Sequence, residues 1–119
     1  MALHNDFGNS GEKLAEEYLL RKGFSILEKN WRFKKAEIDI IAMIQNTLVV
    51  VEVKSRSSNY QGNPQDFVNH KKISLLVSAA NEFVIRKNLD VSVRFDIIAI
   101  LKTNNKMTLD HIENAFLHF

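Results

Sequence analysis

The sequence contains no cysteine and only one proline among its 119 residues. Without cysteine the chain forms no disulfide, carries no thiol chemistry and has no cysteine-based zinc site. No segment has the length of a membrane span, and the start, Met-Ala-Leu-His-Asn-Asp, lacks the basic and apolar regions of a secretory signal. We therefore expect a cytoplasmic protein that makes no contact with membranes.

Positive charge is in only small excess. The formal net charge is +2 and the sequence pI is about 8.9, well short of the positive field of a protein that coats nucleic acid non-specifically. Repeats, low-complexity segments and linkers are missing as well. A chain of this length has room for one core, so we expect a single domain, residues 1–119, of a sheet with helices packed on it.

Two apolar segments, residues 37–44 and 48–56, carry charges where a buried strand would not ordinarily hold them. Glu37 and Asp39 share one face of the first segment, and Glu52 and Lys54 share one face inside the apolar run of the second, which ends at Arg56. Runs this rich in β-branched residues are typical of central strands, so the charges need a reason. Because only residues 45–47 separate the segments, the pattern predicts a β-hairpin.

The register of this hairpin decides what the charges do. An even-numbered loop, residues 45–46 or 44–47, sets Asp39 opposite Glu52 and Glu37 opposite Lys54. Glu37 and Lys54 then form an ordinary ion pair. Carboxylates about 5 Å apart at Cβ repel unless a cation lies between them. Oxygen ligands without cysteine or clustered histidine favour Mg²⁺ or Mn²⁺ over zinc.

The alternative is that these charges alternate outward on a solvated face. Against it, four apolar residues share that face under strict alternation, which leaves one end of the face covered and gathers the charges at the other. The four are Ile41, Met43, Leu48 and Val50. The convergence of four charges favours a functional site.

Basic residues flank the acidic pair in three clusters. Each cluster alone is typical of a solvated surface, but together they predict phosphate contacts along a groove. The expected nucleic-acid-binding residues are Arg32, Lys34 and Lys35 before the acidic strand, Arg56 at the end of the next strand, and Lys71 and Lys72 at the start of the following helix.

The first helix is predicted over residues 10–22, with Gly23 as its stop. Asn9 can cap this helix with Glu12 at the third helical position, which is a capping box. The other interpretation has Glu12 project towards the metal. Spacing alone favours the cap.

The remaining elements follow from periodicity and turn residues. We expect a strand over residues 24–30, a turn or short extension over 31–35, a polar substrate-facing loop over 57–65, and a long helix from Asn63-Pro64 to about Lys87 with a break near Asn69. Strands follow over 91–101 and about 107–112. Arg94 and Asp96 are interpreted as a structural ion pair near the edge of the site, and the four histidines are too scattered to form a ligand set.

These features together resemble the PD-(D/E)xK nuclease superfamily and, within it, the YraN family of small predicted endonucleases related in fold to Holliday-junction resolvases. The resemblance spans nearly the whole chain. It is carried by Gly11-Glu12 with Ala15 and Leu19, Gly23-Phe24, Asn30, Arg32, Glu37-Ile38-Asp39, Val51-Glu52-Val53-Lys54 with Arg56, Lys72, Arg94-Phe95-Asp96 and Asn114-Ala115-Phe116. One departure is Ala36, where the family usually has glycine.

The resemblance implies an α/β, restriction-endonuclease-like fold with a mixed sheet of about five strands flanked by helices. It also implies roles for single residues. Asp39, Glu52 and the carbonyl of Val53 would hold Mg²⁺ or Mn²⁺, Lys54 would position the attacking water, and Glu12 would be an accessory acid.

The sequence thus predicts a metal-dependent endonuclease acting on nucleic acid, with DNA the expected substrate and branched or repair intermediates among the candidates. The competing hypothesis is a non-catalytic nucleic-acid-binding module that retains the fold. The sequence leaves open whether the protein is a homodimer, which cutting both strands of a junction would require.

Overall fold

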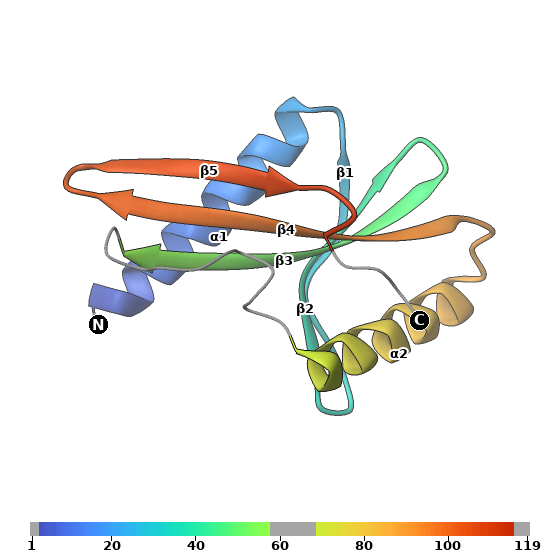
Figure 1. Ribbon diagram of the computed structural model, residues 1–119. Helices are drawn as coiled ribbons and strands as arrows, with labels where there is room; N and C mark the ends of the chain where they lie inside the picture. The colour runs from blue at the N-terminus through green and yellow to red at the C-terminus, as the bar shows by residue number, and fades with distance from the viewer. Residues whose placement is uncertain (1–2, 58–68, 116–119) are drawn as a thin grey trace.

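The computed structural model describes residues 3–57 and 69–115, with side chains from residue 10 onward. It has two helices and five strands (Figure 1). In chain order these are α1 (Leu3–Arg21), β1 (Ser25–Phe33), β2 (Ala36–Ile44), β3 (Thr47–Ser57), α2 (His70–Lys87), β4 (Ser92–Thr103) and β5 (Lys106–Ile112). The predicted α/β fold with a five-stranded mixed sheet is confirmed.

The strands lie in the sheet in the order of the sequence, β1-β2-β3-β4-β5. Neighbours are antiparallel except β3 and β4, which run parallel because α2 lies between them in the chain. In Figure 1 the hairpin of β1 and β2 crosses β4 and β5 steeply, so the sheet is strongly twisted.

Each helix covers one face of the sheet with its own apolar core. On the α1 side Ala15 and Leu19 pack with Ile40, Val51 and Ile98. On the α2 side the buried residues of the helix pack against the alternate positions of β2, β3 and β4, including Ile41, Leu48 and Val50. The apolar residues Ile41, Leu48 and Val50 therefore lie on the surface on which α2 packs, as expected. Ile38 joins the same cluster, however, so the strict alternation predicted for this strand does not hold between Ile38 and Ile41.

The first helix begins earlier than expected. Because α1 runs without interruption from Leu3, Asn9 lies inside it and is not its N-cap, so the predicted capping box is wrong. The stop at Gly23 is confirmed: Gly23 has φ +96°, and its N–H donates to the Leu20 carbonyl over 3.1 Å. The capping explanation for Glu12 is therefore removed.

The first strand is longer than predicted, since β1 continues through Trp31 to Phe33 and only residues 34–35 form the turn. In this turn the residue with positive φ is Lys34, at +56°. Ala36 is buried in the core and does not have a positive φ. Alanine in place of the usual glycine therefore brings no backbone strain.

The second helix begins after Asn69, whose side chain accepts the N–H of Lys72 over 2.9 Å. The predicted break near Asn69 is thus the N-cap of α2. The polar stretch 58–65 and the Asn63-Pro64 helix start lie outside the described residues. Within the described ranges, neither helix is long and apolar enough to cross a membrane.

Candidate functional site

The predicted register of the β2–β3 hairpin is confirmed. Ile44 pairs with Thr47 and Ile40 with Val51, so the loop is residues 45–46. Asp39 and Glu52 are the next residues beyond this ladder, and the charge of Glu52 acts on Asp39. The ladder of Cα pairs ends at Ile40 and Val51. Beyond it the Val53 N–H donates to Asp39 Oδ2 over 2.8 Å, so a carboxylate takes the place of a main-chain partner.

The predicted ion pair between Glu37 and Lys54 is wrong, because each side chain has another partner. Glu37 lies opposite Arg32 on β1, with 3.5 Å between Glu37 Oε2 and Arg32 Nε. Lys54 contacts its own strand neighbour, with 3.6 Å from Lys54 Nζ to Glu52 Oε2. Lys54 is therefore kept beside the acidic pair.

Glu52 is one of two buried charged residues among those described, and only 3% of it is exposed. A second ammonium group reaches the same oxygen, because Lys72 Nζ on α2 lies 2.7 Å from Glu52 Oε2. A buried carboxylate needs such partners to stay ionised. Lys72, predicted as a phosphate contact, thus lies within the acidic site itself.

Asp39 is held in an environment that disfavours its charge. Burial, followed by the carboxylate of Glu52, raises the pKa of Asp39 to about 7, although the hydrogen bond from Val53 works in the opposite direction. A carboxylic acid that holds its proton near neutral pH is the expected outcome when two carboxyl groups meet in a poorly solvated place. A cation bound at this point would relieve the repulsion.

The pKa values of Lys54 and Lys72 shift in opposite directions. Burial and the neighbouring Lys72 lower the pKa of Lys54. Burial also acts to lower the pKa of Lys72, but its contact with Glu52 outweighs burial and raises it. Lys72 therefore stays a firm cation, whereas Lys54 is the more readily deprotonated of the two.

Glu12 lies on the inner side of α1 near the acidic strands. Burial, followed by the charges of Glu37 and Glu52, raises the pKa of Glu12. The close approach of α1 explains its position, since a Cβ on neighbouring Gly11 would collide with the Ser55 hydroxyl on β3. Among the described residues, however, no three Asp, Glu or His side chains form a group able to hold a metal.

The predicted basic residues divide between two places. A cavity of about 270 Å³ lies between the β1–β2 turn and the first turn of α2, and Lys35, Lys71 and Lys72 line it. The others do not line it. Arg32 pairs with Glu37, which is part of the cavity wall, whereas Lys34 lies over the Phe33 ring at 5.3 Å and Arg56 donates to the Ser55 carbonyl.

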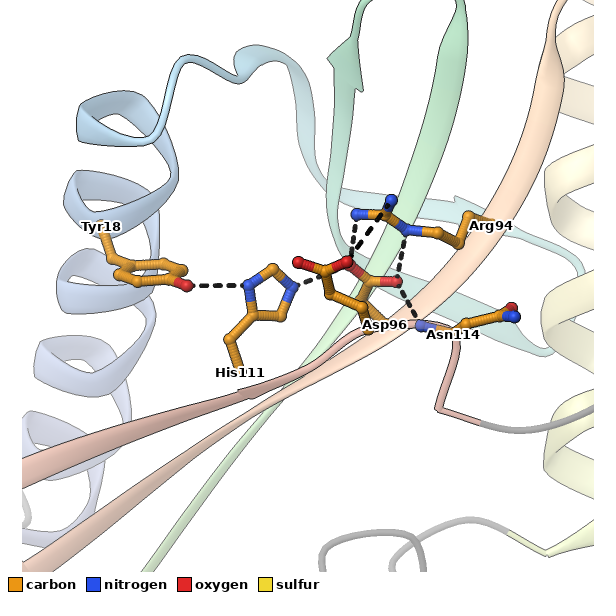
Figure 2. A network of polar contacts seen from close by, with 6 residues as sticks. Tyr18, Arg94, Asp96, His111 and Asn114 are labelled. Atoms are coloured by element: carbon orange, nitrogen blue, oxygen red, sulfur yellow. Dashed lines mark hydrogen bonds and ion pairs between the residues drawn. The ribbon is translucent and has the colours of Figure 1, made fainter.

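A second polar network lies on the α1 side of the sheet (Figure 2). Arg94 Nε and an Arg94 terminal nitrogen each lie 3.0 Å from an oxygen of Asp96, which confirms the predicted ion pair. His111 Nε2 donates to Asp96 over 2.7 Å, and Tyr18 lies 2.9 Å from His111 Nδ1. The role of His111 was missed, because it depends on the pairing of β4 with β5.

The fold and the site thus define a small α/β domain in which a buried carboxylate, Glu52, is paired with two lysines and lies near the half-buried Asp39, beside a cavity lined by lysines. Residues 11–100 match the model of UPF0102, an uncharacterised protein family. The chain belongs to this family, which is the one anticipated by the YraN resemblance.

Relatives of known source cover essentially the whole chain. A UPF0102 protein of Flavobacterium psychrophilum is 58% identical over 119 residues, and one of Christiangramia forsetii is 54% identical over 119 residues, each match spanning 100% of both chains. A UPF0102 protein of Thermodesulfovibrio yellowstonii is 46% identical over 111 residues, 93% of this chain and 96% of its own.

Proposed function

We propose that this protein is a metal-dependent endonuclease of the PD-(D/E)xK type, hydrolysing phosphodiester bonds in nucleic acid, with DNA as the preferred substrate. One observation supports the proposal: the half-buried Asp39 lies close enough to the buried Glu52 for burial and the Glu52 charge together to raise the pKa of Asp39 to about 7. A protein that needed these residues only for stability would gain from replacing one of them with an apolar or amide side chain.

The donor set fits a hard divalent cation. Two carboxylates and a backbone carbonyl are oxygen ligands, and a site with so few protein ligands leaves coordination positions for water and phosphate, as Mg²⁺ prefers. Asp39, Glu52 and the carbonyl of Val53 would hold the ion. When bound, it would polarise the phosphate and lower the pKa of a coordinated water.

Lys54 is the group we assign to the reaction itself. It extends from β3 beside Glu52, its side chain is 20% exposed, and burial lowers its pKa. Such an ammonium group can orient the attacking water and offset charge that develops on the phosphate oxygens. In the hydrolysis, the oxygen of water would bond to phosphorus as hydroxyl while the ester P–O bond breaks, and the departing oxygen would take up the other proton of that water.

The basic cavity supports nucleic acid as the substrate. Lys35 and Lys71 line it next to Lys72, which itself reaches Glu52. Phosphate oxygens entering this cavity would meet several cations at once, one of which, Lys72, contacts Glu52. The contacts would be to the backbone, so they carry affinity and no sequence information.

A second candidate, a non-catalytic nucleic-acid-binding module, is favoured by one observation. The charge of Glu52 is already balanced by two lysines at 2.7 and 3.6 Å, so the site is electrostatically satisfied by the chain's own residues. The same cavity would then serve binding alone.

Calorimetric titration with Mn²⁺ and Mg²⁺ separates these functions, followed by incubation with single-stranded, duplex and branched DNA and with RNA. We expect one metal site that is weakened by Asp39→Asn, and cleavage of at least one substrate. Mn²⁺ should also raise the melting temperature of the wild type more than that of Asp39→Asn, because a ligand of the folded state stabilises it by mass action. Equal shifts in the two proteins would place the ion elsewhere.

A further inference from the structure

Lys72 occupies an unusual position for a residue of a basic, phosphate-facing surface. Its Nζ lies 2.7 Å from Glu52 Oε2, closer than the 3.6 Å from Lys54 Nζ to the same oxygen. Two ammonium groups therefore converge on one buried carboxylate oxygen. Any divalent cation that binds Glu52 must compete with the nearer of them.

The geometry of α2 allows Lys72 to leave Glu52 without disturbing the fold. The backbone of Lys72 is held by the Asn69 cap, which accepts its N–H over 2.9 Å. The side chain is 38% exposed, in contrast to the buried Glu52. A lysine side chain has a flexible four-carbon stem, so its ammonium group can move by rotation about the bonds of the stem while the helix stays in place.

A place for the displaced head group lies next to it. Lys72 lines the cavity of about 270 Å³ together with Lys35 and Lys71. The wall of this cavity also includes Glu37, which pairs with Arg32, so three lysines and one carboxylate line it and an anion would offset the excess positive charge. A phosphate group there would attract the Lys72 head group away from Glu52, and Glu52 would then be open to a metal.

We propose that Lys72 is a displaceable internal counter-ion that couples metal binding at Glu52 to nucleic-acid binding in the adjacent cavity. Without nucleic acid, Lys72 holds Glu52 and weakens metal binding. With a phosphate in the cavity, Lys72 turns to it and metal binding strengthens. This inference rests on the proposed metal site and adds a regulatory property to it.

The coupling must be reciprocal. If nucleic acid raises the affinity for metal by some factor, metal raises the affinity for nucleic acid by the same factor, and factors of roughly 5 to 150 are usual. A residue that only neutralised Glu52 would compete with metal equally with and without nucleic acid. The change in metal affinity on adding nucleic acid therefore separates the two roles.

The test is calorimetric titration of Mn²⁺ in the absence and presence of a DNA duplex with single-stranded tails, with all proteins carrying Lys54→Ala so that the DNA stays intact. The variants are Lys72→Met, which keeps most of the apolar stem, and Lys72→Arg, which keeps the charge. Lys71→Met is the matched control, because it removes a neighbouring cation of the same cavity that is not bonded to Glu52.

We expect Lys72→Met to bind Mn²⁺ about tenfold more tightly than the parent when DNA is absent, and to lose most of the gain that DNA brings. Lys72→Arg and Lys71→Met should retain that gain, although Lys71→Met binds DNA more weakly. Unchanged Mn²⁺ affinity in Lys72→Met, or an equal gain from DNA with and without Lys72, would overturn the inference. Absence of Mn²⁺ binding in every protein, including the unsubstituted chain, would instead overturn the proposed function.

Discussion

At the scale of single residues, Asp39 is a carboxylate whose surroundings disfavour its charge. Its pKa is raised from 3.8 to about 7, first by burial and then by Glu52. The folded state therefore binds more protons than the unfolded state between these two values. In the metal-free protein this costs stability, and the cost grows as the pH rises from about 4 to about 7.

Replacing Asp39 by asparagine should remove this cost, because the amide oxygen can still accept the Val53 N–H while the charge is gone. In metal-free buffer at pH 8 we expect Asp39→Asn to raise the free energy of unfolding by on the order of 1 kcal/mol. The difference should shrink towards pH 5, where Asp39 is itself protonated. Urea denaturation at the two pH values measures it.

Asp90→Asn is the control for this substitution, since Asp90 is exposed after α2. It should leave the pH dependence unchanged. A destabilised Asp39→Asn protein at pH 8 would show that Asp39 is held by favourable contacts and not by like-charge strain.

At the scale of elements, the hairpin of β2 and β3 was the most predictable part of the molecule. The alternation of apolar and charged residues and the short polar loop determine the register, because a slip by one residue would put Ile41 and Val50 on the wrong face. The start of α1 was less predictable. Asn9 is a good N-cap residue by type, but the chain before it also folds as helix, and local capping preference does not reveal that.

Contacts between distant elements were the least predictable part of the site. Lys72 reaches Glu52 across α2 and the sheet, and His111 reaches Asp96 between β5 and β4. Neither contact has a signal in local periodicity, because each depends on how a helix or strand is placed against another. From sequence alone, residues such as Lys72 and His111 are therefore interpreted as surface residues.

The network around Asp96 joins four parts of the chain. Asp96 accepts from Arg94, from His111 and from the N–H of Asn114, and His111 links it to Tyr18 on α1. Burial alone would raise the pKa of Asp96, but the hydrogen bonds from His111 and Arg94 outweigh it and lower the pKa. This carboxylate therefore stabilises the fold while it is ionised.

Asp96→Asn should destabilise the protein by about 3 kcal/mol at pH 7, since it leaves the Arg94 guanidinium without its ionised partner. A depressed pKa contributes stability above the ordinary aspartate range and loses it as the pH falls. The gap between wild type and variant should therefore narrow below about pH 4. Asp110→Asn, at an exposed position of β5, serves as the control in chemical denaturation.

The contrary result is a stability difference between wild type and Asp96→Asn that does not vary with pH, or that is smaller than the effect of Asp110→Asn. It would mean that the contribution of Asp96 to stability does not depend on its charge. The network would then be a set of packing contacts with no electrostatic role.

At the scale of the whole molecule, the distribution of charge matters more than its sum. The net charge is only +2, but Lys35, Lys71 and Lys72 meet at one cavity between the β1–β2 turn and α2. Nucleic-acid affinity should thus depend on this small region and not on a general positive field.

Substituting Lys35 and Lys71 together by alanine should weaken binding to all nucleic-acid sequences by a similar factor and reduce the slope of log K against log salt by about 1 to 2. Fluorescence anisotropy at several salt concentrations measures both. Lys102→Ala with Lys106→Ala is the matched control, since these lysines lie near the β4–β5 turn, away from α2 in Figure 1. An equal loss in the control pair would show that charge alone, and not the cavity, governs binding.

The central claim is that this site cuts nucleic acid with Lys54 acting on water and phosphate. The most direct measurement is cleavage of duplex, single-stranded and branched DNA and of RNA in the presence of Mn²⁺, comparing wild type with Lys54→Ala. We expect the wild type to cut at least one substrate and Lys54→Ala to lose cleavage by a factor of about 10² or more, while it still binds metal and nucleic acid. Cleavage by Lys54→Ala at the wild-type rate, or no cleavage by the wild type, would contradict the claim.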